Sequence, residues 1–309
     1  MGWLKKLFGK ESKQDNAEKT NPEKVSSSLD TGSIRAVVLS DLGNIRTNNE
    51  DMGLFYKVAD ENIIRERGYM LMVADGMGGH QAGEVASRMA TEIISREYFK
   101  QSNGSVEKDL AKVFTLANKK IFEKASSDKT YSGMGTTCTV LVVIDRDIYF
   151  AHVGDSRAYI QKGNSISQIT EDHTYVQELV KNGDITAEEA ATHPKRNILT
   201  NAMGTKSVMR VDTGKYDHPF EEGDKLLLCS DGLYDYLNDK ELKEILSGNE
   251  LKNAAGIMVQ QAKARGGHDN ITVVLAEIIG KEQQDDQLKL TRDVDLPKMT
   301  RDADLPTDI

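Results

Sequence analysis

Two apolar runs in this sequence each end in the dipeptide Asp-Gly, and this shared ending constrains the fold more than any other feature. Residues 69–74 lead into Asp75-Gly76, and residues 225–230 lead into Asp231-Gly232. A strand that ends in Asp-Gly delivers a carboxylate to the rim of a sheet, and its glycine lets backbone carbonyls approach whatever the carboxylate holds. A third acidic turn, with Asp269, precedes the last apolar run. We therefore expect three carboxylates to meet at one rim, although a single Asp-Gly is more often only a turn.

The order of the predicted elements indicates an α+β fold. Helices are expected at residues 82–100, 106–124, 239–246 and 250–265. Strands are expected at residues 34–40, 136–144, 147–153, 157–161, 209–216 and 271–278. Strands thus come in runs, and helices come in runs between them. Such an order is typical of layered folds with mainly antiparallel sheets rather than of regular βαβ alternation.

The chain divides into three parts. Residues 1–32 are predicted to be a basic amphipathic segment and a flexible linker, residues 33–280 a compact catalytic domain, and residues 281–309 a disordered tail with a duplicated TRDxDLP motif. The segment from Met1 to Lys10 has apolar side chains at helical spacing among lysines. It could lie in the headgroup region of an anionic membrane, and a disordered start is an equally good interpretation.

Charge and composition narrow the class of protein. The net charge is −9 and no basic stripe is interleaved with aromatics, which argues against nucleic-acid binding. Cys138 and Cys229 lie in apolar strand-like runs, so we expect buried thiols in a reducing compartment rather than a disulfide. No apolar run approaches the ~20 residues of a membrane-spanning helix, and no secretory signal pattern is present. These features predict a cytoplasmic protein, peripheral at the inner face of the membrane if its first residues bind lipid.

The carboxylate turns point to a particular metal chemistry. Carboxylates, carbonyls and water favour Mg²⁺ or Mn²⁺ over Zn²⁺. A carboxylate that bridges two such ions lets them share and deprotonate a water, which suits phosphoester hydrolysis. Arg46, close in sequence to Glu50 and Asp51, is the candidate for binding the substrate phosphate. The alternative is an ordinary surface cluster of ion pairs.

Seven segments form a pattern that is highly specific in combination. They are RTNNED from Arg46, VADGMGGHQAGEVAS from Val73, GMGTT from Gly133, HVGDSRAY from His152, DHTYVQELVKNGDITAEEAATHP from Asp172, LLCSDGLYD from Leu227 and GGHDNITVV from Gly266. In this order, they resemble the metal-dependent protein phosphatases of the 2C type, and specifically the bacterial serine/threonine phosphatase branch. The resemblance spans residues 34–278 and leaves only the two tails uncovered.

This resemblance implies a β-sandwich of two antiparallel sheets flanked on both faces by helices, a four-layer αββα arrangement. It also implies a metal centre at one edge, with two Mg²⁺ or Mn²⁺ ions and a third, weaker one. By matching positions, Asp75 would bridge two ions, Gly76 would give its carbonyl to one, and Asp231 and Asp269 would hold the other. Asp155 would help bind the third ion together with Asp231.

Further roles follow from the same resemblance. Glu50 and Asp51 would order metal-bound waters, and Arg46 would bind the phosphate. Residues 174–205 match a variable flap beside the active site. Animal members have a histidine after the first Asp-Gly as the proposed general acid, whereas bacterial members and this chain do not, since Met77 stands there. His80 could donate the proton instead, and a structural turn residue is at least as good an interpretation.

The expected function is that of a serine/threonine protein phosphatase. It would hydrolyse phosphoserine and phosphothreonine by in-line attack of a metal-bridging hydroxide, opposing a cognate Ser/Thr kinase whose phosphorylated substrates are its partners. The chain is expected to act as a monomer. The alternative is a catalytically inactive relative used as a binding module, which would be marked by loss of a metal carboxylate or of the arginine.

Overall fold

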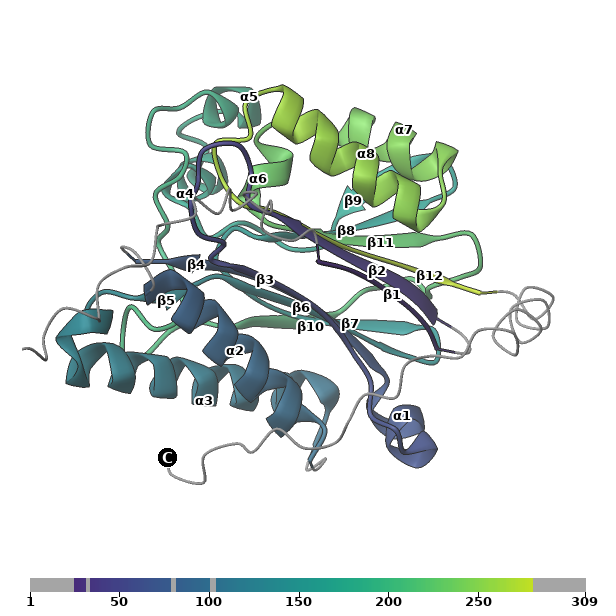
Figure 1. The fold of residues 1–309 in the computed structure, drawn as a ribbon, viewed down its shortest axis with the longest axis horizontal. Coiled ribbons are helices and arrows are strands. Elements are labelled where there is room, and N and C mark those ends of the chain that lie inside the picture. The colour runs from purple at the N-terminus through teal and green to yellow at the C-terminus, as the bar shows by residue number, and fades with distance from the viewer. Residues whose placement is uncertain (1–24, 32–33, 79–81, 101–103, 280–309) are drawn as a thin grey trace, which may run out of the picture.

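The fold is described from a computed structural model, in which residues 25–31, 34–78, 82–100 and 104–279 are described. Two antiparallel sheets form its centre (Figure 1). One has the strand order β1-β2-β12-β11-β8-β9, and the other has the order β10-β7-β6-β4-β3 with β5 paired to β4. The strands are β1 (Val25–Thr31), β2 (Ile34–Asp41), β3 (Asp51–Tyr56), β4 (Tyr69–Met77), β5 (Gly135–Thr136), β6 (Cys138–Ile144), β7 (Asp147–Val153), β8 (Arg157–Lys162), β9 (Ser165–Gln168), β10 (Asp212–Lys215), β11 (Lys225–Cys229) and β12 (Ile271–Ile278).

Helices cover both outer faces of the sandwich. Figure 1 shows α2 and α3 below the sheet that contains β4, and α7 and α8 above the sheet that contains β12. Two short helices, α4 and α5, project beyond the sheets and form the flap that the sequence predicted in residues 174–205. The helices are α1 (Glu61–Arg67), α2 (Ala82–Tyr98), α3 (Val106–Ser127), α4 (Tyr175–Asn182), α5 (Ala187–Ala191), α6 (Asp231–Tyr234), α7 (Asp239–Gly248) and α8 (Leu251–Ala264). The predicted αββα sandwich is confirmed.

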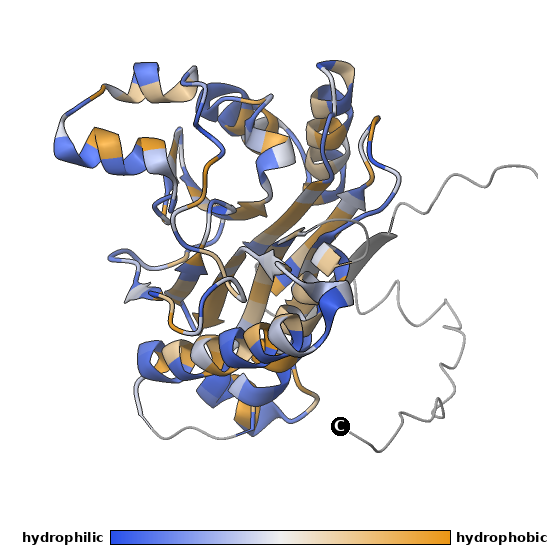
Figure 2. Cartoon of the chain, turned by 90° about the vertical axis from the view of Figure 1, so that its left-hand side faces the viewer, coloured by the Kyte–Doolittle hydropathy of each residue, from blue (hydrophilic) through white to orange (hydrophobic). Residues whose placement is uncertain are grey.

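The central strands are apolar on both faces because both faces are covered. In β4, Leu71 and Val73 pack into the core between the two sheets, whereas Met70 and Met72 pack into the core under α2 and α3. All four side chains are completely buried, and each such burial contributes ~1.5–3 kcal/mol. Figure 2 shows this pattern as apolar strands enclosed by helices with polar outer faces. The strands are therefore held firmly, and their ends are fixed points on which a site can be built.

The N-terminal boundary of the fold differs from the prediction. Residues 25–31 were predicted to be linker, but they form β1, an edge strand that pairs along its whole length with β2. The linker prediction is therefore wrong for this segment. Its serine-rich sequence gave no apolar alternation, and an edge strand needs little, since the backbone bonds to its neighbour define it. The segment from Met1 to Lys10 and the tail 281–309 lie outside the described residues.

Two further findings concern the chain as a whole. Within the described ranges, no helix is both long and apolar enough to cross a membrane. Cys138 and Cys229 are both buried and both free thiols, as expected.

Candidate metal centre

Asp75 lies opposite a second carboxylate in the neighbouring strand. In the antiparallel pair of β3 and β4, Asp51 is the register partner of Asp75. The strand does not end at the Asp-Gly turn, since β4 continues to Met77 and pairs there with β5. The Asp75 backbone is bonded twice to Thr137, whose N–H donates to the Asp75 carbonyl at 2.9 Å and whose hydroxyl accepts from the Asp75 N–H at 3.0 Å. The sheet therefore fixes the position of this carboxylate on both sides.

Gly76 is needed because the chain packs tightly there. A Cβ at this position would lie 2.2 Å from the carbonyl oxygen of Gly83 and 2.7 Å from that of Glu50. The Gly76 N–H also donates to the Glu50 carbonyl at 3.1 Å. A glycine without a side chain thus brings the Glu50 loop and the first turn of α2 against the rim that carries Asp75.

Asp231 comes from the opposite sheet and begins a short helix. It follows β11 and Ser230 and is the first residue of α6, where the sequence predicted only a turn. A Cβ at the next residue, Gly232, would lie 2.0 Å from the Asn270 carbonyl oxygen, so the Asp231 turn packs closely on the loop that carries Asp269. Among the described residues, the buried Oδ1 of Asp231 is one of three buried side-chain polar atoms without a hydrogen-bond partner. A buried carboxylate oxygen without a partner is costly unless a cation occupies its open side.

Arg46 and Asp269 pair at the mouth of the site. Arg46 Nη2 donates to Asp269 Oδ2 at 2.7 Å, and the two side chains are 50% and 38% exposed. Asp269 Oδ1 accepts from the N–H of Asn270 at 2.8 Å. The guanidinium that was predicted to bind phosphate therefore lies beside a predicted metal ligand.

Asp155 approaches the same point from the loop between β7 and β8. It is 7% exposed. It lines one cavity of about 400 Å³ together with Arg46, Glu50, Asp75, Gly76, Asp231, Asp269 and neighbouring residues. The structure thus brings together every predicted metal-binding residue. His80 lies outside the described residues, so its proposed role as a proton donor stays a prediction.

The acidic side chains repel one another strongly in this arrangement. Burial raises the pKa of Asp75 well above its ordinary value, and the charges of Asp51 and Asp231 raise it further. Burial, followed by the charge of Asp155, does the same to the pKa of Asp231. Burial raises the pKa of Asp51 to about 6, although hydrogen bonds led by that from Ser230 oppose the shift. Such a group of carboxylates is stable in its charged form only next to a compensating positive charge.

These residues fit a hard divalent cation. The donors are carboxylate and backbone carbonyl oxygens, which Mg²⁺ and Mn²⁺ prefer, and Asp231 Oδ1 offers a position open to an ion. Within the described part of the chain, no three Asp, Glu, His or Cys side chains form a closed cage around one point. Mg²⁺ commonly binds through one or two carboxylates and keeps several waters, so an open donor set of this kind suits it.

Asp51 lies behind the cavity wall rather than on it. It is 5% exposed, and its Oδ2 accepts from the Ser230 hydroxyl at 2.7 Å. Glu50 does line the cavity, and its carboxylate packs against Gly83, where an added Cβ would be 2.2 Å from Oε2. That both residues order metal-bound waters stays a prediction.

One residue that organises the site was missed. Asn270 donates from Nδ2 to the carbonyls of Leu42 and Asn48 at 3.1 and 3.0 Å, and its Oδ1 accepts from the Glu50 N–H at 2.9 Å. It therefore holds the Arg46–Glu50 loop over the metal centre. An asparagine directly after Asp269 was visible in the sequence, but its partners are more than two hundred residues away.

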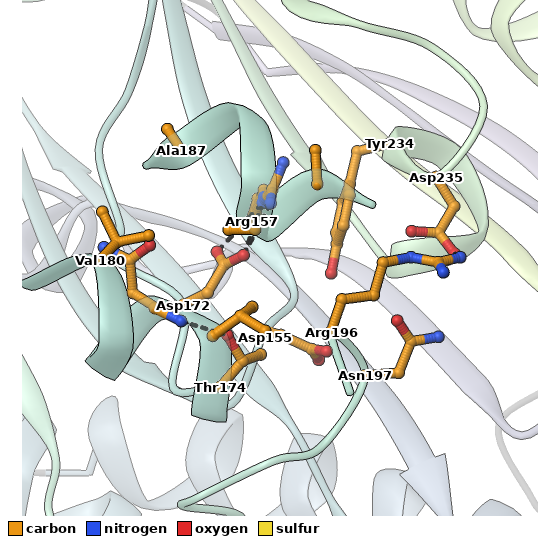
Figure 3. Close-up of a pocket in the computed structure, with 14 residues that line it drawn as sticks. Asp155, Arg157, Asp172, Thr174, Val180, Ala187, Arg196, Asn197, Tyr234 and Asp235 are labelled. Atoms are coloured by element: carbon orange, nitrogen blue, oxygen red, sulfur yellow. Dashed lines mark hydrogen bonds and ion pairs between the residues drawn. The ribbon is translucent and has the colours of Figure 1, made fainter. Parts of the chain in front are cut away.

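A second cavity of about 380 Å³ opens beside the centre, under the flap (Figure 3). It shares Asp155 and Asn197 with the first cavity. On its floor, Arg157 donates to both oxygens of Asp172, with Nη2 at 2.7 Å from Oδ2, and the guanidinium lies 3.7 Å above the Tyr234 ring. The flap thus overhangs the acidic centre and encloses space next to it.

Comparison with known proteins agrees with this geometry. The sequence profile of the protein phosphatase 2C family matches residues 59–275. The serine/threonine phosphatase Stp of Listeria monocytogenes is 40% identical over 244 residues, which cover 77% of this chain and 93% of that protein. The protein phosphatase PhpP of Streptococcus pneumoniae is 38% identical over 78% of this chain and 96% of its own length.

Solved structures are similar as well. The serine/threonine phosphatase PstP of Mycobacterium tuberculosis superposes with a TM-score of 0.70 at 34% identity, over 80% of this chain and all of that one. The catalytic domain of PstP in complex with two manganese ions gives a TM-score of 0.67 at 33% identity, over 80% and 99% of the two chains. The resemblance inferred from the motifs is confirmed. The chain therefore belongs to the protein phosphatase 2C family and is a serine/threonine protein phosphatase of its bacterial branch.

Proposed function

We propose that Asp75, Asp231 and Asp269, with the carbonyl of Gly76, hold two Mg²⁺ or Mn²⁺ ions, and that Asp155 and Asp231 hold a third. The observation that carries this proposal is the convergence of these carboxylates on one 400 Å³ cavity with Arg46 at its mouth. The 2C family is metal-dependent, and a related catalytic domain has been solved with two manganese ions. Ions held there would supply a water activated as a nucleophile at neutral pH.

Residues of the chain perform the remaining steps. Arg46 is half exposed and bonded to Asp269 through a single nitrogen, so its other nitrogens are available to a substrate phosphate. A guanidinium binds phosphate through two parallel hydrogen bonds, which orients the phosphorus for attack. The flap closes one side of the centre, and the adjoining cavity gives room for residues next to the phosphorylated side chain.

We also propose that the substrates are phosphorylated bacterial proteins, among them a Ser/Thr kinase that this enzyme opposes. The relatives named above are protein phosphatases, which supports phosphoproteins as the substrate class. The buried free thiols of Cys138 and Cys229 support action in a reducing compartment, the cytoplasm. Incubation with an autophosphorylated bacterial Ser/Thr kinase should remove its phosphate, and phosphate loss no faster than without enzyme would contradict the kinase as substrate.

The test of the metal proposal is phosphate release from a phosphothreonine peptide. We expect turnover with Mn²⁺, loss of turnover after chelation, and recovery when Mn²⁺ is restored. Asp231→Asn should lose turnover by several orders of magnitude, whereas Asp217→Asn, an exposed aspartate outside the site, should match the unaltered enzyme. Full turnover in chelator, or equal rates for the two variants, would refute the assignment. Peptide binding without turnover would support the binding-module alternative.

A further inference from the structure

Residues 174–199 of the flap leave and rejoin the body of the protein beside His173, and the rest of the flap is bonded to β5, where Met203 pairs with Thr136. Thr174 and Leu199 form an isolated antiparallel bridge, and the Tyr175 N–H donates to the Ile198 carbonyl at 2.8 Å. The residue before the flap is His173, and its carbonyl accepts from the N–H of Thr200 at 2.9 Å. Both ends of residues 174–199 are therefore tied together at His173.

The same histidine holds the loop that carries Asp155. The His173 N–H donates to the Gly154 carbonyl at 2.7 Å, and its ring Nδ1 accepts from the Gly154 N–H at 3.1 Å. Gly154 has φ +107°, and a Cβ there would lie 2.5 Å from Cβ of Thr137. Since Thr137 is bonded to the backbone of Asp75, one continuous set of contacts joins Asp75, Thr137, Gly154, His173 and the flap.

The bonding around His173 assigns its protonation. Nδ1 accepts from Gly154 and lies 3.0 Å from the Asn201 side-chain amide, so it carries no proton. Nε2 therefore carries the proton and donates to Asp212 Oδ2 at 3.1 Å. The His173 ring is 2% exposed and packs 4.8 Å from the completely buried ring of His152. Both ring nitrogens are hydrogen-bonded: Nδ1 binds the loop between β7 and β8, and Nε2 binds β10.

We propose that His173 is a positioning residue that couples the Asp155 loop to the flap, so that Asp155 reaches the metal centre only when the His173–Gly154 bond is made. This inference rests on the proposed metal centre. It assigns to His173 a role that an ordinary buried histidine lacks, because the ring joins two parts of the active site rather than only filling space. The neighbouring Asp172, which binds Arg157 just beyond Asp155, strengthens the attachment from the other side (Figure 3).

Two variants distinguish the contributions of the two ring nitrogens. An asparagine places its Oδ1 as many bonds from Cα as histidine Nδ1, so His173→Asn keeps the acceptor for Gly154 and loses the bond to Asp212. His173→Gln reaches Asp212 instead and loses the acceptor for Gly154. Both variants lose the ring contact with His152, so their melting temperatures should fall by similar amounts. Exposed His218→Gln is the control for the substitution itself.

The first measurement is Mn²⁺ binding by calorimetry. We expect His173→Gln to weaken the weakest Mn²⁺ site by ~10–100-fold, as is usual when a residue that orients a metal ligand is lost. His173→Asn should remain within about threefold of the unaltered protein. Kinetics on a phosphopeptide should show a lower kcat for His173→Gln that high Mn²⁺ partly restores.

The second measurement is amide hydrogen exchange in chelator, which needs neither metal nor activity. His173→Gln should raise exchange at residues 154–156 and in the flap together, whereas His173→Asn should raise it at neither. Equal effects of Asn and Gln, or faster exchange in only one of the two regions, would overturn the proposal. If His173→Gln does not fold, Asp212→Ala at the partly exposed edge strand β10 removes only the bond to Nε2 and should leave exchange unchanged in both regions, as His173→Asn does, so faster exchange at residues 154–156 and in the flap would overturn the proposal. Failure of the unaltered protein to bind Mn²⁺ would instead refute the metal proposal and leave the exchange test standing.

Discussion

Asp155→Asn should stabilise the metal-free protein while impairing the enzyme. Burial, followed by the charge of Asp172, raises the pKa of Asp155 from 3.8 to about 7, although Arg157 opposes this. The folded state therefore keeps the proton on Asp155 at pH values where the unfolded chain has released it. Stability is unaffected by this group below about pH 4 and falls as the pH rises towards 7. Asparagine carries no charge, so the stability of the variant does not fall in this way as the pH rises.

The size of the effect follows from the two pKa values. Each pH unit between 3.8 and about 7 costs the metal-free protein ~1.4 kcal/mol, which gives ~4 kcal/mol at pH 8. Neighbouring carboxylates share protons with Asp155 and reduce the gain, so we expect about 2–4 kcal/mol. For a domain of this size, that corresponds to roughly 4–16 °C in Tm. At pH 5 the gain should shrink to about a third.

The assay is thermal unfolding in chelator at pH 5 and pH 8, with Asp172→Asn as the matched control. Asp172 is bound through both oxygens to the partly buried Arg157, so its replacement removes charged hydrogen bonds and should cost ~1.5–3 kcal/mol. The two variants make the same chemical change a short distance apart and should shift Tm in opposite directions. A lower Tm for Asp155→Asn at pH 8, or a gain that does not depend on pH, would refute the reasoning.

Three further predictions concern other parts of the molecule. Arg46→Ala should lower kcat/KM for a phosphopeptide by ~10–100-fold through loss of a charged hydrogen bond, and Arg46→Lys should restore little of it, since Lys cannot bind phosphate bidentately. Equal kcat/KM for Arg46→Ala and the unaltered enzyme would contradict phosphate binding by Arg46. Gly76→Ala should lower the free energy of unfolding in urea by ~1–3 kcal/mol and abolish turnover, because the new Cβ collides with the Gly83 carbonyl oxygen 2.2 Å away. A variant that is folded and active would show that the backbone there can move apart at little cost. Arg67→Met should lower the free energy of unfolding by ~3–5 kcal/mol, because it leaves the buried Asp109 carboxylate, 2.7 Å away, without its cation, whereas turnover per folded molecule should not change. Adding Asp109→Leu should recover part of the stability, and no recovery would show that the loss is one of packing.

Much of the fold was predictable because its signals are local. The strands β4 and β6 are continuous apolar runs, and α2 and α3 repeat their apolar residues at helical spacing. The edge strand β1 was not predictable, since its serine-rich sequence shows no apolar alternation and its pairing with β2 defines it. The helix that begins at Asp231 was read as a turn because Asp-Gly is a turn signal, and its four residues are too few to show a period.

The candidate site divides in the same way. Asp75, Asp231 and Asp269 lie within or next to the ends of recognisable strands, so their convergence could be inferred from sequence. The pairing of Asp51 with Asp75 depends on strand register, which the sequence of β3 does not reveal. The roles of Asn270 and His173 depend on partners brought close only by the completed fold. Side chains that bind the backbone of a distant loop leave no periodic mark in the sequence.

Asp75 and Asp51 belong to one sheet, whereas Asp231 and Asp269 adjoin strands of the other. The distance between the two pairs of carboxylates therefore depends on the distance between the two sheets. Side chains such as Leu141 and Leu228, which fill the space between the layers, act as a spacer although they touch no substrate. Enlarging or trimming them should alter the separation of the carboxylates, so residues deep in the sandwich can tune metal preference without any change at the mouth.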